Sequence, residues 1–78
     1  MNIAVAGLGY VGLTNAVLLA QKNKVYALDV DAARVAMVNN RRSPVSDVEL
    51  EDFLLSHNLN LTATLKPELA YGTAIFIP

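Results

Sequence analysis

Three glycines near the amino terminus have the type and spacing of a phosphate-binding loop. Gly7, Gly9 and Gly12 form the pattern G-x-G-x-x-G directly after the apolar residues 3–6. In such a pattern the first glycine permits a tight turn, the second lets the backbone approach a pyrophosphate, and the third permits close packing of a helix on the strand. The free amide groups at the start of that helix attract phosphate oxygens. A glycine-rich turn that binds no ligand is the alternative.

An acidic residue follows at the distance that a dinucleotide site requires. Asp29 ends the second apolar run, 22 residues after Gly7 and 17 after Gly12, and sites of this kind have a spacing of about 20. Its carboxylate would accept hydrogen bonds from the adenosine ribose and repel a 2′-phosphate, which favours NAD over NADP. Arg34 keeps NADP open, because an arginine near this position accommodates a 2′-phosphate in some sites. A contact of Arg34 with the adenine or the ribose and a solvated cation on the helix surface are equally open.

Tyr10 and Val11 lie between the second and third glycines. Their backbone N–H groups are expected to contact the cofactor, and the Val11 side chain is expected to pack against protein. His57 is the only histidine, and no group placed beside it suggests a catalytic pair. The other charged residues outside the predicted site are expected to be solvated: Asp47, Glu49, Glu51, Asp52, Arg41 and Arg42. The residues therefore predict no catalytic group and no metal site within this chain.

The elements that position these residues alternate between strands and helices. Apolar runs predict strands at 2–6, 24–30, 60–63 and 74–77, and helices are predicted at 11–22, 32–39, 47–56 and 67–71. Asp31 is expected to cap the second helix, and Ser46 with Glu49 fits the capping box S-x-x-E of the third. Alternation of this kind implies a parallel sheet with right-handed crossovers. The predicted fold class is α/β, a Rossmann-like three-layer α/β/α fold with a partial, truncated doubly wound parallel sheet of about four strands.

The composition excludes several classes of protein. The 78 residues, of which 54% are hydrophobic, indicate one domain at most, with enough apolar material for a core. The absence of cysteine excludes a disulfide scaffold, a cysteine nucleophile and a thiolate metal site within this chain. A net charge of −1 without a basic stripe argues against nucleic acid as a partner. No apolar run approaches the ~18 residues of a membrane span, and no signal peptide is evident, so no membrane partner and a cytoplasmic location are expected.

The motifs together resemble a known family. Residues 3–13 with the glycine loop in the form G-L-G-Y-V-G-L, residues 28–30 and the loop Ser43-Pro44-Val45 resemble the amino-terminal part of the UDP-glucose/GDP-mannose dehydrogenase family. The resemblance implies an intact enzyme that oxidises UDP-glucose to UDP-glucuronate with two NAD⁺, through a covalent intermediate on a cysteine. It also implies a role for each matching residue: the three glycines bind the pyrophosphate, the backbone of Tyr10 and Val11 contacts the cofactor, Asp29 holds the ribose, and Arg34 contacts the cofactor.

The resemblance covers only part of such an enzyme. The catalytic cysteine of the family and its sugar-binding and C-terminal domains have no counterpart here, so 1–78 is expected to be the N-terminal part of an NAD-binding Rossmann domain and inactive alone. NAD is the expected partner, and UDP-glucose is expected to bind only the full-length enzyme. The alternatives are another Rossmann dehydrogenase of GDP-mannose, hydroxyacyl-CoA or 6-phosphogluconate type, and a non-catalytic dinucleotide-binding module. A half-sheet leaves strand edges unpaired, so self-association, for example by strand pairing between copies, is also expected.

Overall fold

The computed structural model describes residues 1–70, 72–73 and 75–77. The elements follow one another as β1 (Asn2–Ala6), α1 (Tyr10–Leu19), β2 (Lys24–Leu28), α2 (Ala32–Asn39), α3 (Val48–Ser56), β3 (Leu61–Thr64), the short 3-10 helix η1 (Pro67–Ala70) and β4 (Ile75–Ile77). This order confirms the predicted alternation. Residues 71 and 74, where the last helix was predicted to end and the last strand to begin, lie outside the described residues. In the described ranges no helix is long and apolar enough to span a bilayer.

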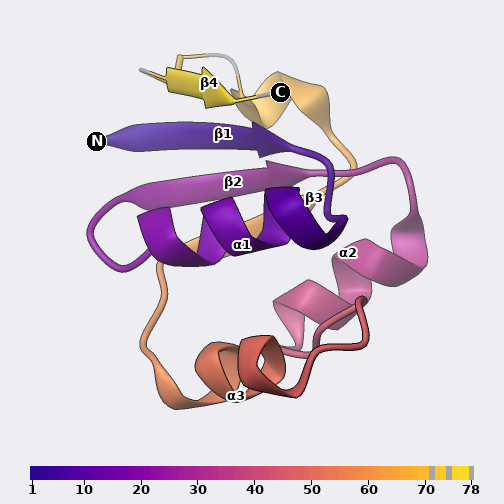
Figure 1. The fold of residues 1–78 in the computed structure, drawn as a ribbon. Coiled ribbons are helices and arrows are strands. Elements are labelled where there is room, and N and C mark those ends of the chain that lie inside the picture. The colour runs from indigo at the N-terminus through magenta and orange to yellow at the C-terminus, as the bar shows by residue number, and fades with distance from the viewer. Residues whose placement is uncertain (71, 74, 78) are drawn as a thin grey trace.

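The four strands form one parallel sheet in the order β3-β2-β1-β4 (Figure 1). Val5 in β1 is in register with Ala27 in β2, which is in register with Ala63 in β3. Because parallel strands share one direction, their carboxyl ends meet at one edge of the sheet. The glycine loop follows β1 and Asp29 follows β2 at this edge. The predicted α/β, Rossmann-like fold with about four parallel strands is confirmed.

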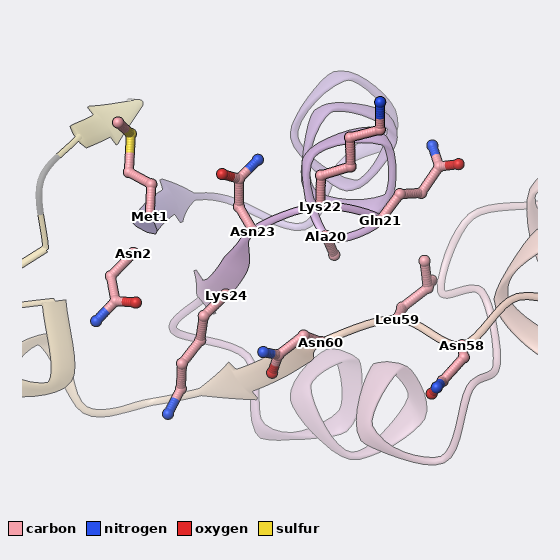
Figure 2. A pocket seen from close by; sticks show the side chains of 10 residues that line it. All are labelled: Met1, Asn2, Ala20, Gln21, Lys22, Asn23, Lys24, Asn58, Leu59 and Asn60. Carbon is pink, nitrogen blue, oxygen red and sulfur yellow. The ribbon is translucent and has the colours of Figure 1, made fainter.

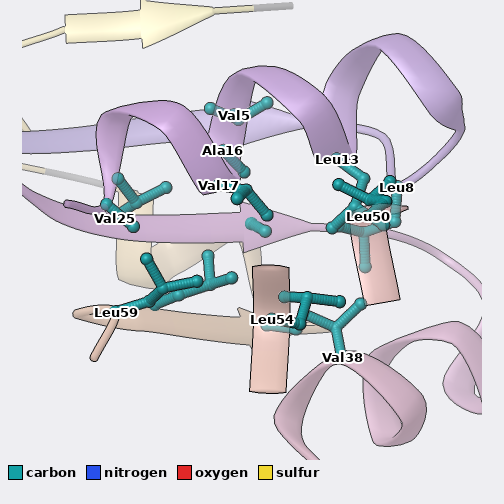
Figure 3. Close-up of a cluster of buried hydrophobic side chains, with 14 of the residues drawn as sticks. Val5, Leu8, Leu13, Ala16, Val17, Val25, Val38, Leu50, Leu54 and Leu59 are labelled. Carbon is teal, nitrogen blue, oxygen red and sulfur yellow. The ribbon is translucent and has the colours of Figure 1, made fainter. Parts of the chain in front are cut away.

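One face of the sheet carries the core. Strand residues with odd numbers face α1, α2 and α3, and Figure 3 shows their side chains meeting those of the three helices. The helices contribute mainly aliphatic residues at spacings of three and four, which places them on one side of each helix. The buried cluster comprises Ile3, Val5, Leu8, Leu13, Ala16, Val17, Ala20, Val25, Ala27, Val38, Leu50, Leu54, Leu59, Leu61 and Ala63.

The opposite face of the sheet is more polar and less covered. Tyr26 and Leu28 are half-buried there and Thr62 is exposed. Pro67 at the start of η1 lines one hollow together with Ala6 and Leu28, so η1 begins beside the carboxyl ends of β1 and β2. Within the described part of the chain, three α-helices therefore cover one face and η1 contributes to the other.

The start of α3 differs from the prediction. Asp47, and not Ser46, is the N-cap, and its Oδ1 accepts a hydrogen bond from the Leu50 N–H at 3.0 Å. Since the helix begins one residue later than expected, Glu49 is the second helical residue and lies outside the position that a capping box requires. The prediction at Asp31 is confirmed, because its side chain accepts from the N–H groups of Ala33 and Arg34.

Candidate cofactor-binding site

The glycine loop turns sharply and brings α1 close to β1. Gly7 has a φ of +93°, which is strained for any residue with a Cβ, and its N–H donates to the Leu28 carbonyl at 2.7 Å. A Cβ at Gly12 would overlap the Gly7 carbonyl oxygen and lie 2.9 Å from the Gly7 carbonyl carbon. The tight turn predicted at Gly7 and the close approach predicted at Gly12 are both present.

The start of α1 is open to a ligand. A Cβ added to Gly9 would meet no atom within 4 Å in the described structure, so the space beside this backbone is free. Gly9 is the N-cap and provides no side chain to the helix, and the first turn of α1 contains no acidic residue. The first hydrogen bond of the helix runs from the Leu13 N–H to the Gly9 carbonyl at 2.9 Å. The amides of Tyr10 and Val11 come before it and have no acceptor within the helix.

The other two α-helices differ from α1 in this respect. Asp31 caps α2 and Asp47 caps α3, so that a carboxylate of the chain already occupies each of those N-termini. The positive end of the α1 dipole has no such carboxylate. Of the three described α-helices, α1 is therefore the one whose N-terminus is available to an external anion.

Asp29 links the carboxyl end of β2 to the glycine loop. Its Oδ2 accepts the Leu8 N–H at 2.8 Å, and its Oδ1 accepts the Asp31 N–H at 2.9 Å. The side chain is only 6% exposed. Burial by itself raises the pKa of this carboxyl, but the backbone hydrogen bonds from Asp31 and Leu8 and the nearby Arg34 charge outweigh burial, and the pKa lies below its usual value. Asp29 is therefore held as a carboxylate beside the loop.

Leu8 is a residue of the loop that the sequence pattern left unassigned. Its side chain is fully buried in the core cluster, and its backbone N–H donates a hydrogen bond to the Asp29 carboxylate. Leu8 thus anchors the loop between two glycines whose backbone must stay uncovered. The only sequence signal for this role is an apolar residue between two glycines. That signal is weak, but it could have indicated that the Leu8 side chain is buried and holds the loop in place.

Arg34 completes the polar side of a hollow at the carboxyl edge of the sheet. Its Nη1 lies 3.6 Å from Asp29 Oδ2, and its Nε lies 3.9 Å from Asp31 Oδ2, with the side chain 49% exposed. The hollow has a volume of about 410 Å³. The residues that line it are Ala6, Gly7, Leu28, Asp29, Val30, Arg34, Leu65 and Pro67. The structure thus brings Gly7, Asp29 and Arg34 together around one space.

Three apolar residues of this hollow were not predicted from the sequence. Val30 is almost fully exposed after β2, while Leu65 and Pro67 follow β3. Their signal is positional, because any residue just after a parallel strand lies at the edge where ligands bind in this class of fold. The apolar character of these three residues suits a flat ring better than a phosphate.

Tyr10 and Val11 lie at the start of α1, away from the hollow beside Asp29. The Tyr10 side chain is 59% exposed and lines a separate hollow of about 200 Å³ between α1 and α3. The Val11 side chain is 71% exposed, so the expectation that it packs is wrong for this chain. Leu13, two residues later, takes the inward position, because α1 turns the Val11 side outward.

A separate hollow lies at the opposite edge of the sheet, at the amino ends of the strands. It has a volume of about 740 Å³, and Figure 2 shows polar side chains around it, including Asn2, Lys22, Lys24 and Asn60. These residues belong to the amino ends of the strands and to the turn after α1. The glycine loop and Asp29 are at the carboxyl ends, so this hollow is separate from the candidate site.

Several of the polar and charged residues outside the site have local structural contacts. His57 stacks on Phe53 with ring centroids 3.6 Å apart, and Arg42 pairs with Glu51 at 2.9 Å. The prediction that Arg41 is solvated is wrong, because its guanidinium donates to backbone carbonyls of Val38, Leu59 and Leu61.

This chain is similar to several dehydrogenases. Residues 1–78 match the model described as UDP-glucose/GDP-mannose dehydrogenase family, NAD binding domain. The chain is 49% identical over 71 residues to the UDP-glucose 6-dehydrogenase of Streptococcus pneumoniae. The matched stretch covers 91% of this chain and 18% of that enzyme. It is 38% identical over 78 residues to the UDP-glucose 6-dehydrogenase of Campylobacter jejuni, with 97% and 20% covered.

The likeness extends to three-dimensional structure. The crystal structure of a ternary complex of GDP-mannose dehydrogenase from Pseudomonas aeruginosa superposes with a TM-score of 0.84 at 28% identity, over 100% of this chain and 19% of that one. The chain spans about a fifth of the length of the curated relatives it matches. It belongs to the UDP-glucose/GDP-mannose dehydrogenase family, and it matches the NAD-binding domain of that family along all 78 residues.

Proposed function

We propose that NAD binds along the carboxyl edge of the sheet. The pyrophosphate would lie over Gly9 and the amides of Tyr10 and Val11, where the backbone is uncovered and α1 has no carboxylate of its own. The ribose would bind the Asp29 carboxylate. The observation that carries the proposal is that the hydrogen bond between Asp29 and Leu8 joins the acid to the loop. Gly7 and Gly12 would act by shaping this loop.

The hollow beside Asp29 would receive the adenine. Its apolar walls at Val30, Leu65 and Pro67 fit the faces of an aromatic ring, and Arg34 would lie over the ring or reach the ribose edge. Because Arg34 faces two carboxylates, Asp29 and Asp31, its charge is already matched. This arrangement supports NAD over NADP, since a 2′-phosphate would meet a net negative surface.

For the whole protein we propose the activity of a UDP-glucose 6-dehydrogenase, which would oxidise UDP-glucose to UDP-glucuronate with two NAD⁺. Residues 1–78 would be the N-terminal part of its NAD-binding Rossmann domain, located in the cytoplasm. Both relatives compared above are UDP-glucose 6-dehydrogenases, which supports UDP-glucose as the substrate. The structural match to a GDP-mannose dehydrogenase supports GDP-mannose as the second candidate substrate. UDP-glucose would bind outside these residues.

Self-association of the chain is a further part of the proposal. The outward side of α1 is apolar, with Val11 and Leu18 exposed, and Val48 at the start of α3 is 79% exposed. Exposed apolar residues that lie on one side of a helix, as Val11 and Leu18 do in α1, are typical of a contact surface. Sedimentation of the chain over a range of concentrations tests this part, and a monomer throughout would contradict it.

Calorimetric titration with NAD⁺ and NADP⁺ tests the cofactor proposal. We expect NAD⁺ to bind more tightly than NADP⁺, and Asp29→Ala to weaken NAD⁺ binding. Asp52→Ala is the matched control, because it removes an exposed acid from α3, far along the chain from the glycine loop. Equal affinity of the parent and Asp29→Ala for NAD⁺ would place the ribose elsewhere.

A further inference from the structure

The β3 strand forms one edge of the sheet, and its sequence favours strand pairing. Residues 59–65 contain no charge, no proline and no glycine. Segments of this kind pair readily with copies of themselves when the edge of a sheet exposes their backbone groups. The carbonyls of Asn60 and Thr64 point toward β2, where they accept the amides of Val25 and Asp29. The alternate residues Leu59, Leu61 and Ala63 therefore direct their backbone groups away from β2.

The side chain of Asn39 occupies the outer edge at Ala63. Its Nδ2 donates to the Ala63 carbonyl at 2.9 Å, and its Oδ1 accepts the Ala63 N–H at 2.8 Å. A carboxamide has the same donor and acceptor as a peptide group. Asn39, at the end of α2, thus provides the pair of hydrogen bonds that a residue of an added strand would make.

Arg41 covers the preceding part of the same edge. Its Nη2 donates to the carbonyls of Leu59 at 3.2 Å and Leu61 at 3.0 Å, and its Nη1 donates to the last-turn carbonyl of Val38 at 3.1 Å. The backbone of Arg41 has a φ of +60°, an uncommon conformation for a residue with a Cβ. This conformation turns the chain at the end of α2 and aims the guanidinium at β3.

We propose that Asn39 and Arg41 close the β3 edge against addition of the same strand from a second copy of this chain. Together they hold three carbonyls and one amide of the edge, and Arg41 adds a positive charge beside a segment that has none. Charge at the edge of a sheet disfavours strand addition. Association of the parent chain would then use surfaces other than β3. The inference is independent of cofactor binding.

Neighbouring residues supply matched controls. The Asn40 side chain bonds to Ala36 of its own helix, and Arg42 pairs with Glu51, so neither touches β3. We expect Asn39→Ala with Arg41→Gly to raise the sedimentation-average mass with concentration above that of the parent. Asn40→Ala with Arg42→Ala should match the parent. Glycine is chosen at Arg41 because it tolerates the positive φ and spares the helix end.

A reporter on β3 locates the contact. The chain has no cysteine and Thr62 is exposed, so a spin label on Thr62→Cys reports on this strand alone. We expect the short-range dipolar coupling of labels on adjacent strands when Asn39→Ala and Arg41→Gly are present, and no such short-range coupling in the labelled parent or in the labelled control. The proposal would be overturned if the folded double variant sediments like the parent, or if it associates without this coupling.

Asn39→Asp separates an exposed edge from a weakened fold. The carboxylate keeps an acceptor for the Ala63 N–H but loses the donor for the Ala63 carbonyl, and it places a charge at the edge. We expect this variant to unfold at lower urea concentration than the parent and yet to show no added association. If Asn39→Asp associates as strongly as Asn39→Ala, lost stability and not the open edge is the cause, and the proposal fails. Should the double variant not fold, the single variants Asn39→Ala and Arg41→Gly decide by the same readouts.

Discussion

Replacing Gly12 by alanine places a methyl group where the Gly7 carbonyl already lies. The added Cβ would overlap that oxygen and lie 2.9 Å from its carbon. Both atoms belong to the backbone of a loop that is held by a hydrogen bond to Leu28 and by the buried side chain of Leu8. Neither atom can move aside as a flexible side chain does, so α1 has to shift away from β1.

The size of the effect follows from two opposing contributions. Overpacking in a well-packed region costs about 1–3 kcal/mol, and contact with backbone places Gly12→Ala toward the upper end. Alanine in place of glycine inside a helix returns up to about 1 kcal/mol. We therefore expect the free energy of unfolding to fall by roughly 1–2 kcal/mol. For a chain of this size each kcal/mol lowers Tm by about 4–8 °C.

Gly9→Ala is the matched control, because it adds the same methyl group three residues earlier. There the methyl group meets no atom within 4 Å, and the backbone φ of −71° suits alanine. Stability should stay within about 1 kcal/mol of the parent, since a stiffer unfolded chain offsets a poorer N-cap. The NAD⁺ affinity should fall instead, because the methyl group enters the space proposed for the pyrophosphate.

Urea unfolding followed by circular dichroism measures the stability of both variants, and calorimetric titration measures their NAD⁺ affinity. We expect Gly12→Ala to lose stability, and Gly9→Ala to lose NAD⁺ affinity without losing stability. A Gly12→Ala variant as stable as the parent would refute the packing argument. A Gly9→Ala variant with parental NAD⁺ affinity would refute the position proposed for the pyrophosphate.

Further substitutions and a change of pH have defined outcomes. Asp29→Ala leaves the Leu8 N–H without its acceptor, so urea unfolding should show a loss of about 1–3 kcal/mol. Because the folded pKa of Asp29 lies below its unfolded value, its stabilisation is present above the ordinary value of about 3.9 and is lost as pH falls through the folded value. The stability advantage of the parent over Asp29→Asn should therefore shrink in that acid range, and a constant advantage would contradict the charge argument. Arg34→Ala removes a half-exposed ion pair, so stability should change by less than about 1 kcal/mol while NAD⁺ affinity falls in calorimetry; unchanged affinity would exclude Arg34 from the site. Asp47→Ala should cost about 0.5–2 kcal/mol and Ser46→Ala almost nothing by thermal unfolding, and the reverse order would restore Ser46 as the cap.

Features that depend on short segments could be predicted from the sequence. The glycine spacing indicated the turn after β1. An aspartate directly before a predicted helix identified Asp31 as the cap of α2, and in the structure its carboxylate accepts from the amides two and three residues later. The cap of α3 was placed one residue too early, at Ser46 instead of Asp47. Serine and aspartate are both good N-cap residues, and here they are adjacent. A local sequence pattern therefore cannot decide at which of the two the helix begins.

The amino-acid sequence by itself determined the order of strands and helices, the loop of Gly7, Gly9 and Gly12, and the place of Asp29 at the end of β2. Those properties follow from backbone preferences and hydrophobic periodicity over a few residues. Only the tertiary structure decided that Asp29 bonds to Leu8 and that Arg41 is a structural donor instead of a solvated cation. These contacts join residues 18 to 21 positions apart, and the packing of α2 against β3 and of the loop against β2 brings them within reach. No pattern within one segment contains that information, because the partner groups are backbone amides and carbonyls that every residue type shares.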